Sequence, residues 1–401
     1  MSQDRLDWTG RTLEVEIGPV AHGGHCVARH EGRVLFVRHA LPGEKALVHV
    51  TEDNGGSFCR ADAVTVHIPS PDRVTPPCPL AAPGECGGCD WQHASPAAQR
   101  ELKATVVMEQ LKRIAGLDRQ VTVEELPGGM LDWRTRVRLA VGSGGRAGLR
   151  AHRSHRVIPL RDCPIAAPGA LEGVLSRSWK PGTELEVAKD GAGQVHVAEI
   201  RKDRPPRIMA GDGLAHEHAA GRDWRLAAGG FWQVHPAAAD TFAGVVEEWA
   251  QAPVGGTAWD LYGGVGLFAA VLARQVGPTG SVLAIESSKR AVVDGTANLV
   301  DLPQVRLRVG RVERVLGSAE LRAERPDVVV LDPPRKGAGK DVVAAVAEAG
   351  PSRVVHVACD PAALARDVGL FRGQGYELRE LRAFDAFPMT HHMECIALLT
   401  R

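Results

Sequence analysis

The feature that most constrains the fold is a repeated strand-loop-helix pattern after about residue 229. Short apolar segments alternate there with longer stretches rich in alanine and leucine, as expected for parallel strands joined by helical crossovers. This pattern predicts an α/β unit with a parallel sheet covered by helices on both faces, closed by an antiparallel pair at residues 376–385 and 394–399. The expected parallel strands are residues 258–261, 281–285, 305–309, 328–331 and 354–358.

The chain before this unit has a different texture. Short alternating segments divided by Gly and Pro run from about residue 11 to 67 and predict a small, OB-like β-barrel. Residues 68–95 are rich in Pro, Gly and Cys and show no period, and strand-like alternation returns at about 121–225, after a helix candidate at 100–115. We therefore expect a β-barrel, a central α+β domain and a Rossmann-like α/β domain, at residues 1–68, 69–228 and 229–401.

The net charge gives no support for a nucleic-acid partner, because 48 Lys and Arg balance 48 Asp and Glu. The charge distribution is more informative, since residues 134–161 hold eight arginines and no acidic residue, which indicates a basic face. The first eight residues lack the apolar core of a signal peptide, and no apolar run of about 18 residues is present to span a bilayer. We expect a cytoplasmic protein with no membrane partner and no obligate protein partner, whose eight cysteines are ligands, nucleophiles or core residues rather than disulfides.

Four cysteines are candidates for a metal centre. Cys86 and Cys89 form a Cys-x-x-Cys pair around two glycines, and Cys78 and Cys163 are each followed by proline. Two thiolates at this spacing can converge on one centre, and the glycines let backbone N–H groups turn toward bound sulfur. A structural zinc and an iron-sulfur cluster both fit, and the Cys-Pro pairs favour iron-sulfur; Cys163 also fits an unrelated buried thiol.

A glycine-rich turn follows the first strand of the α/β unit. In Trp259-Asp-Leu-Tyr262-Gly-Gly264-Val-Gly266, the glycines permit a ligand to approach the backbone closely, and the following helix start offers unpaired N–H groups. Glu286 ends the next strand, 20 residues after Gly266, in a position to accept hydrogen bonds from a ribose diol. The turn alone fits a nicotinamide dinucleotide as well as a methyl donor.

Asp332-Pro-Pro-Arg335 distinguishes between these cofactors. It ends an apolar strand with a carboxylate and two rigid prolines, which fixes a polar edge where a methyl donor meets its acceptor and is not expected in a nicotinamide enzyme. Amino-methylating enzymes place an aromatic residue after the prolines to stack on a base, and here the position is Arg335. A carbon acceptor is therefore expected, although Asp332 alone also fits a turn-forming cap.

Cys359 and Glu394 supply the two groups that methylation of a pyrimidine carbon requires. Cys359 ends a strand at a turn into a helix, and Glu394 begins the last apolar strand. Uracil C5 is too weak a nucleophile to attack a sulfonium methyl group directly, but addition of a thiolate to C6 places electron density on C5. A base must then remove the C5 proton so that the thiol leaves. Alone, Cys359 also fits a core thiol and Glu394 a solvated carboxylate.

An aromatic segment precedes these motifs. The target base in a folded RNA must leave its stack to reach such a site, and aromatic side chains commonly hold flipped bases. Phe231-Trp-Gln233 is a candidate platform for the base, with core packing as the alternative.

Taken in order, the motifs resemble those of the TRAM-containing RNA uracil-C5 methyltransferases over nearly the whole chain. The resemblance implies an RNA-binding TRAM barrel at the amino terminus and a class I methyltransferase domain at the carboxyl terminus. It also implies that Cys359 is the nucleophile, that Glu394 is the base, and that S-adenosylmethionine and a 4Fe-4S cluster are the cofactors. The implied binding residues are Gln233, Tyr262, Gly264, Glu286 and Asp332 for the methyl donor, Phe231 and Arg335 for the base, and Cys78, Cys86, Cys89 and Cys163 for the cluster.

Two residues depart from the family pattern. His235 stands where the family usually has asparagine, which bears on the adenosyl pocket, and Ala358 replaces serine before the nucleophile, which bears on how the thiol is hydrogen-bonded. The resemblance implies RNA as the partner, with ribosomal RNA preferred and tRNA as the alternative, and implies that residues 134–161 contact RNA phosphates. A non-catalytic RNA-binding protein of this fold and a nicotinamide oxidoreductase are the competing classes. The intact nucleophile and base disfavour the first, and the Asp-Pro-Pro-Arg segment disfavours the second.

Overall fold

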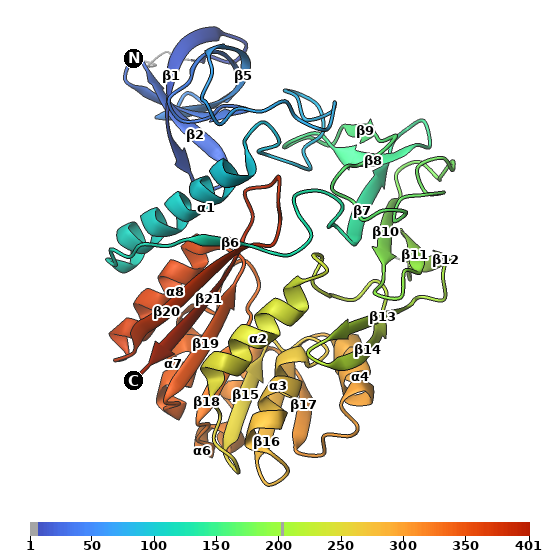
Figure 1. Ribbon diagram of the computed structural model, residues 1–401, viewed down its shortest axis with the longest axis vertical. Helices are drawn as coiled ribbons and strands as arrows, with labels where there is room; N and C mark the ends of the chain where they lie inside the picture. The colour runs from blue at the N-terminus through green and yellow to red at the C-terminus, as the bar shows by residue number, and fades with distance from the viewer. Residues whose placement is uncertain (1–6, 202–203) are drawn as a thin grey trace, which may run out of the picture.

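The computed structural model describes residues 7–201 and 204–401 (Figure 1). The expectation for the extreme amino terminus concerns mainly residues 1–6, which lie outside the described residues. Within the described ranges, no helix has both the length and the apolar character needed to cross a membrane.

The amino-terminal strands close into the predicted barrel, at the top of Figure 1. Alternation places Val15 and Ile17 inside the barrel, while Glu14 and Glu16 face solvent, because successive side chains of a strand point to opposite faces. The strands pair in the order β1-β2-β3-β5-β4, with β3 and β5 parallel. Their bounds are Thr12–Ala21 for β1, His25–His30 for β2, Arg33–Arg38 for β3, Lys45–Asp53 for β4 and Phe58–Ile68 for β5.

An irregular segment, residues 69–95, leads from the barrel to helix α1 (Pro96–Gln110). The helix begins where the Ser95 hydroxyl accepts a hydrogen bond from the N–H of Ala98, with proline in the first turn, where its missing N–H is harmless. A π-helical turn (Leu111–Ala115) follows and ends at Gly116 in the left-handed conformation. The predicted helix at 100–115 is thus confirmed, but it starts earlier and widens at its end.

The middle of the chain forms a six-stranded antiparallel sheet, on the right of Figure 1, and a separate hairpin below it. The sheet order is β12-β11-β10-β7-β8-β9, and β13 pairs with β14 in the hairpin. The bounds are Arg136–Val141 for β7, Ala147–Arg150 for β8, Val157–Pro159 for β9, Glu184–Lys189 for β10, Val195–Ile200 for β11, Arg207–Ala210 for β12, Leu214–Ala219 for β13 and Arg222–Ala227 for β14.

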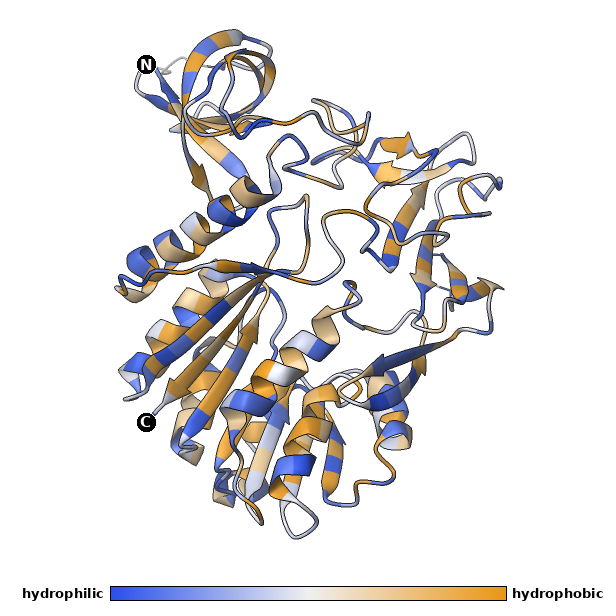
Figure 2. Ribbon diagram, in the orientation of Figure 1, coloured by the Kyte–Doolittle hydropathy of each residue, from blue (hydrophilic) through white to orange (hydrophobic). Residues whose placement is uncertain are grey.

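The carboxyl-terminal part contains the expected parallel sheet with an antiparallel closing pair. The sheet order is β17-β16-β15-β18-β19-β21-β20-β6, in which β15 to β19 run parallel to one another and β21 runs antiparallel to β19 and β20. Figure 2 shows hydrophobic residues concentrated in the central strands, as expected for strands covered on both faces. The strand bounds are Thr257–Leu261 for β15, Ser281–Glu286 for β16, Val305–Val309 for β17, Val328–Leu331 for β18, Arg353–Ala358 for β19, Glu377–Asp385 for β20 and Glu394–Thr400 for β21.

Helices cover the two faces of this sheet and form two separate cores. One core gathers around α2 and α3, and the other around α5, α7 and α8. The helix bounds are Ala238–Ala250 for α2, Leu267–Val276 for α3, Lys289–Asn298 for α4, Val312–Leu316 for α5, Ala319–Ala323 for α6, Gly339–Ala349 for α7 and Pro361–Gly373 for α8.

The last strand of this sheet comes from far upstream in the chain. Strand β6 (Val123–Glu125) pairs in parallel with β20, and α1 packs against α8, so that Val107, Leu111 and Val123 share a core with Leu331. The predicted division had assigned this stretch to residues 69–228. The alternation of apolar and polar residues reports only on neighbouring residues. It therefore could not indicate that β6, which precedes the central sheet, would pair with β20 of the carboxyl-terminal sheet.

Candidate active site

A cavity of about 740 Å³ opens at the carboxyl ends of β15, β16 and β18, which is the usual ligand position in open α/β sheets. Its volume lies within the range of cavities that bind small molecules. The structure brings almost all the predicted site residues together here, although they come from distant parts of the chain. The cavity is lined by Phe231, Gln233, Tyr262, Glu286, Asp332, Arg335, Cys359 and Glu394, among others.

The sheet register places Cys359 and Glu394 at equivalent positions on neighbouring strands. In the antiparallel pairing of β19 and β21, Ala358 is opposite Cys395. Cys359 is the first residue after β19, and Glu394 is the first residue of β21, so the pairing brings both to the same edge of the sheet. The pairing of β19 with β21 therefore places a thiol and a carboxyl group at the wall of one cavity.

Burial makes both groups hard to ionise. Burial raises the pKa of the Cys359 thiol to about 12, and the negative charges of Glu394 and Asp332 add to the effect, while Arg335 opposes it. Burial also raises the pKa of Glu394 well above its usual range, again with a contribution from Asp332. Within residues 7–201 and 204–401, one carboxyl oxygen of Glu394, Oε2, has no hydrogen-bond partner. Burial therefore favours the protonated forms of both the thiol and the carboxyl group.

Burial also favours the protonated forms of two aspartates at the site. It raises the pKa of Asp332, which lines the cavity, and that of Asp260 to about 7 each. Asp260 accepts a hydrogen bond from the N–H of Ala269 at 2.8 Å, at the start of α3, and its Oδ1 has no partner among the residues that the structure describes. Several buried acidic groups therefore lie close together at this site.

The glycine-rich turn lies between β15 and α3 as predicted, with Glu286 held against it. The N–H of Gly264 donates to Glu286 Oε2 at 3.1 Å, and the N–H of Ser288 donates to Oε1 at 2.6 Å. Tyr262 has a positive φ of 67°, a strained conformation for a residue with a side chain. Gly263 leaves no room for a Cβ, which would lie 2.9 Å from Asp260 Oδ2. Gly264 is linked to the cavity through Glu286, which lines the cavity and accepts this hydrogen bond.

The aromatic segment divides between the cavity and the core. Phe231 is 70% exposed at the cavity wall, and Gln233 also lines the cavity. Trp232 instead packs in the core against Trp224, with the ring centroids 5.9 Å apart. Of the two alternatives for this segment, the exposed platform fits Phe231 and core packing fits Trp232.

His392 is a cavity residue to which the sequence had assigned no role. Arg335 Nη2 lies 3.0 Å from His392 Nε2, and the rings of His391 and Phe387 flank the imidazole. Burial, together with the neighbouring charges of His391 and Arg335, lowers the pKa of His392 to about 3. The ring is therefore neutral and can accept a hydrogen bond from the guanidinium group. The sequence feature that could have identified His392 is its position two residues before Glu394, the predicted base.

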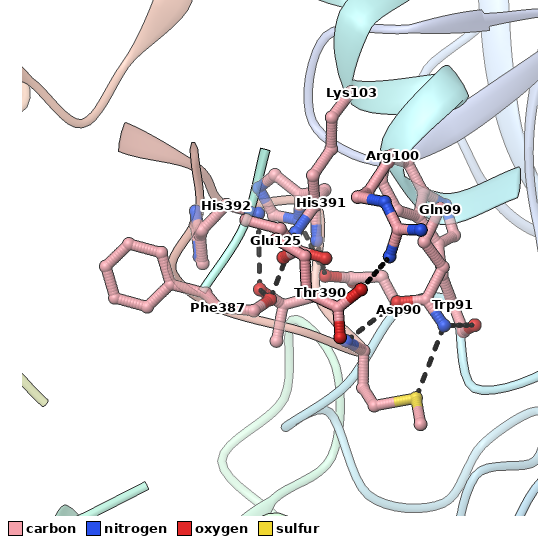
Figure 3. Close-up of polar contacts among 12 residues, drawn as sticks. Asp90, Trp91, Gln99, Arg100, Lys103, Glu125, Phe387, Thr390, His391 and His392 are labelled. Atoms are coloured by element: carbon pink, nitrogen blue, oxygen red, sulfur yellow. Dashed lines mark hydrogen bonds and ion pairs between the residues drawn. The ribbon is translucent and has the colours of Figure 1, made fainter. Parts of the chain in front are cut away.

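The loop that precedes Glu394 is clamped by the cysteine-rich segment and α1 (Figure 3). Met389 has a φ of 67°, and each of its backbone polar groups is engaged: its N–H donates to Gln99 Oε1 at 2.8 Å, and its carbonyl accepts from the N–H groups of Asp90 and Trp91 at 2.9 and 3.0 Å. Asp90 also hydrogen-bonds His391 Nδ1 at 2.6 Å. A strained residue held on all sides in this way typically marks a functional site.

A buried ion pair fixes the start of the same loop. Lys103 Nζ, on α1, donates to Asp385 Oδ1 at 2.5 Å and to the Phe387 carbonyl at 3.2 Å, and the side chains of Lys103 and Asp385 are both fully buried. Residues far upstream of the α/β unit thus determine the path of the segment that carries His392 and Glu394.

The four candidate metal ligands lie close together at the irregular segment. Burial raises the pKa of Cys86, Cys89 and Cys163, and each feels the negative charge of at least one other thiol of the set, including Cys78. The N–H of Gly88 donates to Cys86 Sγ at 3.4 Å, as expected near a sulfur ligand. Across residues 7–201 and 204–401, however, no group of three or more His, Cys, Asp or Glu side chains is arranged to hold a metal ion. The donor chemistry fits a cluster, but the arrangement of the side chains does not yet support one.

Two family models match the chain. The model of the TRAM domain matches residues 8–64, which form the barrel, and the model described as tRNA (Uracil-5-)-methyltransferase matches residues 224–401. A relative from Streptomyces avermitilis, described as an uncharacterized RNA methyltransferase, is 49% identical over 97% of this chain and 98% of its own length. Another so described, from Corynebacterium efficiens, is 41% identical over 98% of this chain and 95% of its own.

The chain belongs to the TRAM-containing RNA uracil-C5 methyltransferases. The family predicted from the motifs is confirmed, and with it the class of enzyme, an S-adenosylmethionine-dependent RNA (uracil-C5)-methyltransferase. This class excludes the nicotinamide oxidoreductase alternative. A solved structure from Pyrococcus abyssi, tRNA (uracil-54, C5)-methyltransferase in complex with S-adenosyl-L-homocysteine, has a TM-score of 0.72 over 97% of this chain and 100% of that chain. At 22% identity, this likeness shows the shared fold.

The departure at His235 lies behind the methyltransferase cavity rather than in its wall. The imidazole is buried and stacks on Trp133, with ring centroids 6.0 Å apart, and its Nδ1 accepts from the N–H of Ala237. Its contact with the pocket is therefore indirect. The departure at Ala358 is a buried core position on β19.

The arginine-rich run does not form one continuous basic face. Arg136 is half-buried and turned inward, where it pairs with Glu217 at 3.1 Å and donates to the carbonyl groups of Ala228 and Gly230. That part of the prediction is wrong. Arg138 and Arg150 lie on the sheet surface and pair with Glu184. The other exposed arginines lie in three separate loops: Arg146 between β7 and β8, Arg153 and Arg156 between β8 and β9, and Arg161 after β9.

Proposed function

We propose that this family member transfers a methyl group from S-adenosylmethionine to C5 of a uridine in a structured RNA, through a covalent adduct of Cys359 with uracil C6. One observation carries this proposal: Cys359, which directly follows β19, and Glu394, which begins the neighbouring strand β21, both lie at the wall of a cavity that Asp332 and Glu286 also line. Nucleophile, base and donor-binding groups thus share one enclosed space.

In the proposed reaction, Cys359 is the nucleophile and Glu394 is the base. The Cys359 sulfur adds to C6, which breaks the C5–C6 double bond and moves the electron pair toward C5. C5 would then take the methyl group, and the electron pair of the broken S–CH3 bond would stay on the donor, which leaves as S-adenosylhomocysteine. Glu394 removes the C5 proton, and the electrons of that C–H bond restore the double bond as the Cys359 sulfur leaves as a thiolate. S-adenosylmethionine supplies the methyl group and a positive sulfonium charge.

The acidic cavity needs positive charge before this chemistry can start. Burial favours the protonated forms of Cys359 and Glu394, and the positive charge of Arg335 favours their ionised forms. A positive charge bound beside them lowers the pKa values of all the nearby acids, because opposite charge favours the ionised form. We therefore propose that loading of the donor prepares Cys359 for attack and Glu394 for proton removal.

The target base is proposed to rest against Phe231 and to be oriented by Arg335. Phe231 offers an exposed ring at the cavity wall, and the guanidinium of Arg335 is already aligned by His392. Aromatic stacking combined with edge recognition is the usual way to hold a flipped base. Gln233, Tyr262, Gly264, Glu286 and Asp332 are the residues proposed to hold the methyl donor.

Ribosomal RNA is the proposed substrate, and tRNA is the second candidate. The barrel together with the four-cysteine set supports the ribosomal assignment, since the resemblance to ribosomal enzymes rests on that combination. The matching family model and the Pyrococcus abyssi structure carry tRNA in their descriptions, which favours the alternative. A cytoplasmic location, where both RNAs are modified, is part of this proposal. The predicted division into residues 1–68, 69–228 and 229–401 is also kept as a proposal, with the first two parts serving RNA binding.

We also propose that Cys78, Cys86, Cys89 and Cys163 hold a 4Fe-4S cluster with a structural role. The support is the closeness of the four thiols and the absence of helix or strand in residues 69–95. Anaerobically purified protein is expected to contain about four irons and to absorb broadly in visible light. Colourless protein with one zinc per chain would replace the cluster by a zinc site, and metal-free folded protein would remove both.

A 5-fluorouridine RNA tests the reaction. Fluorine cannot leave C5 as a proton, so the adduct is expected to accumulate on Cys359 and to be absent from Cys359→Ala. Glu394→Gln is expected to form the adduct with ordinary RNA but to release it slowly. Adduct formation in Cys359→Ala, or normal release by Glu394→Gln, would overturn the mechanism. Methylation of ribosomal RNA and of tRNA fractions in parallel, followed by nucleoside analysis, identifies the substrate.

A further inference from the structure

A second cavity, of about 360 Å³, lies between the barrel and the central sheet. It shares no lining residue with the catalytic cavity, and we call it the barrel cleft. One wall comes from strands β2 to β5, and the other from the turn between β8 and β9. Its lining residues include His25, Phe36, Arg38, Glu52, Arg60, Asp62, His152, Arg153 and Arg156.

The barrel cleft is positively charged. Four arginines line it, against the two acidic residues Glu52 and Asp62. Arg153 bridges the cleft to Glu52 of the barrel at 3.2 Å, which shows that the two walls are close enough to hold one small group. Burial raises the pKa of Asp62, which weakens its negative charge further. Such a cleft is suited to an anion.

Several buried nitrogen atoms in the cleft have no hydrogen-bond partner within residues 7–201 and 204–401. They are Nε2 of His25, Nε2 of His152 and Nε of Arg60, and they come from both walls. A buried polar group without a partner costs about 1–3 kcal/mol, so such groups rarely cluster unless a ligand completes them. Burial and the charge of Arg38 lower the pKa of both histidines to about 4, an effect that a bound anion would oppose.

A row of rings crosses the cleft from the barrel to the central domain. Phe58 meets Phe36 edge to face at 5.4 Å, Phe36 meets His25 at 6.2 Å, and His25 meets His152 at 6.1 Å. Phe58 is 41% exposed, and the Arg60 guanidinium lies 5.3 Å from its ring centroid. Aromatic faces within a basic groove are the arrangement by which proteins bind single-stranded nucleic acid.

We propose that the barrel cleft binds one unpaired nucleotide of the RNA substrate, away from the uridine that is methylated. Its phosphate lies between Arg60 and the β8–β9 turn, and its base lies against Phe36. The proposal rests on the proposed function, since it takes RNA as the substrate.

The barrel cleft is positioned so that one RNA strand can reach both sites. His25, in the cleft, directly follows the turn His22–Gly24, which lines a cavity of about 170 Å³ together with Arg335 and Cys359. Gly24 lies so close to the catalytic loop that a Cβ there would be 2.8 Å from His391. A nucleotide in the cleft therefore fixes the strand just behind the turn that borders the nucleophile.

The test compares Arg60→Ala and His152→Ala with the matched control Arg29→Ala, which removes the same charge from an exposed position of β2 outside the cleft. We expect each cleft variant to raise KM for the folded RNA about tenfold and to act on KM rather than kcat, corresponding to about 1.4 kcal/mol. Arg29→Ala is expected to change KM less than twofold. Unchanged KM in both cleft variants, or a loss confined to kcat, overturns the proposal. Arg60→Lys, which keeps the charge, is expected to recover most of the affinity for RNA.

Two further measurements separate the possible failures. A 5-fluorouridine pentanucleotide carries the target base without a folded RNA around it, so an adduct with the wild-type protein supports the proposed function whatever the cleft variants do. If no adduct forms with either this probe or folded RNA, the proposed function fails. Titration with uridine 5′-monophosphate and with inorganic phosphate tests for a free ligand. Micromolar binding of either that folded RNA does not displace would assign the cleft to that free anion and overturn the RNA assignment.

Discussion

Replacement of Lys103 by methionine tests how strongly the upstream chain holds the catalytic loop. Lys103 reaches from α1 to Asp385 at the end of β20 and to the Phe387 carbonyl, and both members of the ion pair are fully buried. Methionine has a similar volume, so the change removes charge and hydrogen bonds without creating a large cavity. Asp385 is then left in the core without its cation.

The structure sets the size of the expected effect. Asp385 Oδ2 already lacks a hydrogen-bond partner, so the ammonium group of Lys103 carries most of the compensation for that buried carboxylate. Breaking a buried ion pair from one side costs about 3–5 kcal/mol, whereas replacing both partners by apolar residues is often neutral. We expect Lys103→Met to lower the free energy of unfolding by about 4 kcal/mol, and Lys103→Met/Asp385→Leu to recover most of it.

Urea unfolding followed by tryptophan fluorescence, with limited proteolysis of the 386–393 loop, measures this effect. Lys112→Met is the matched control, because Lys112 pairs with Asp118 at 2.9 Å while their side chains are 70% and 74% exposed. That exposed pair is expected to contribute less than about 1 kcal/mol. The reasoning is refuted if Lys103→Met and Lys112→Met are equally stable, or if the double variant is as unstable as Lys103→Met.

Three further outcomes are expected. Gly263→Ala is expected to weaken S-adenosylhomocysteine binding about tenfold in calorimetry, because the added Cβ would lie 2.9 Å from Asp260. The control Gly144→Ala, whose Cβ meets open space, is expected to bind normally. Equal affinities of the two variants would contradict this prediction. Iodoacetamide should alkylate Cys359 slowly at pH 7 and about tenfold faster per pH unit up to pH 9, because burial raises the pKa of this thiol to about 12. The alkylation rate is measured by mass spectrometry, and a plateau by pH 8 would contradict the raised pKa. Because burial raises the pKa of Asp332 to about 7, the folded state binds more protons than the unfolded state between about pH 4 and 7, so stability falls as pH rises through that window. Asp332→Asn should flatten that fall in urea unfolding and exceed the wild-type stability at pH 8, and a steeper fall would count against the assignment.

The sequence was sufficient to bring the candidate site residues together because they lie at the ends of regular strands. Asp332 follows β18, Cys359 follows β19 and Glu394 begins β21, and in this fold all three ends meet at one edge of the sheet. Once the alternation of strands and helices was recognised, the position of these residues followed from the topology alone. Their pKa values did not follow, because burial depends on how the helices close over the sheet.

Other features depend on contacts that no local pattern encodes. Strand β6 is only three residues long, and it joins β20 across more than 250 residues of chain, so periodicity gave no signal for it. Lys103 reads as a surface residue of an amphipathic helix until its partner Asp385 is placed beside it. The arginine-rich run failed as a single face for the same reason, since Arg136 finds its partner Glu217 on a distant strand.

The clamp on Met389 suggests why the cysteine-rich segment accompanies this catalytic domain. The two N–H groups that hold the Met389 carbonyl belong to Asp90 and Trp91, the residues immediately after Cys89. A residue at a φ of 67° costs about 1–3 kcal/mol, so the loop keeps this path only while those donors stay in place. Any group that orders the cysteines therefore also orders the donors, and through Met389 it determines where Glu394 enters the cavity. A structural cluster would in this way support catalysis without moving an electron.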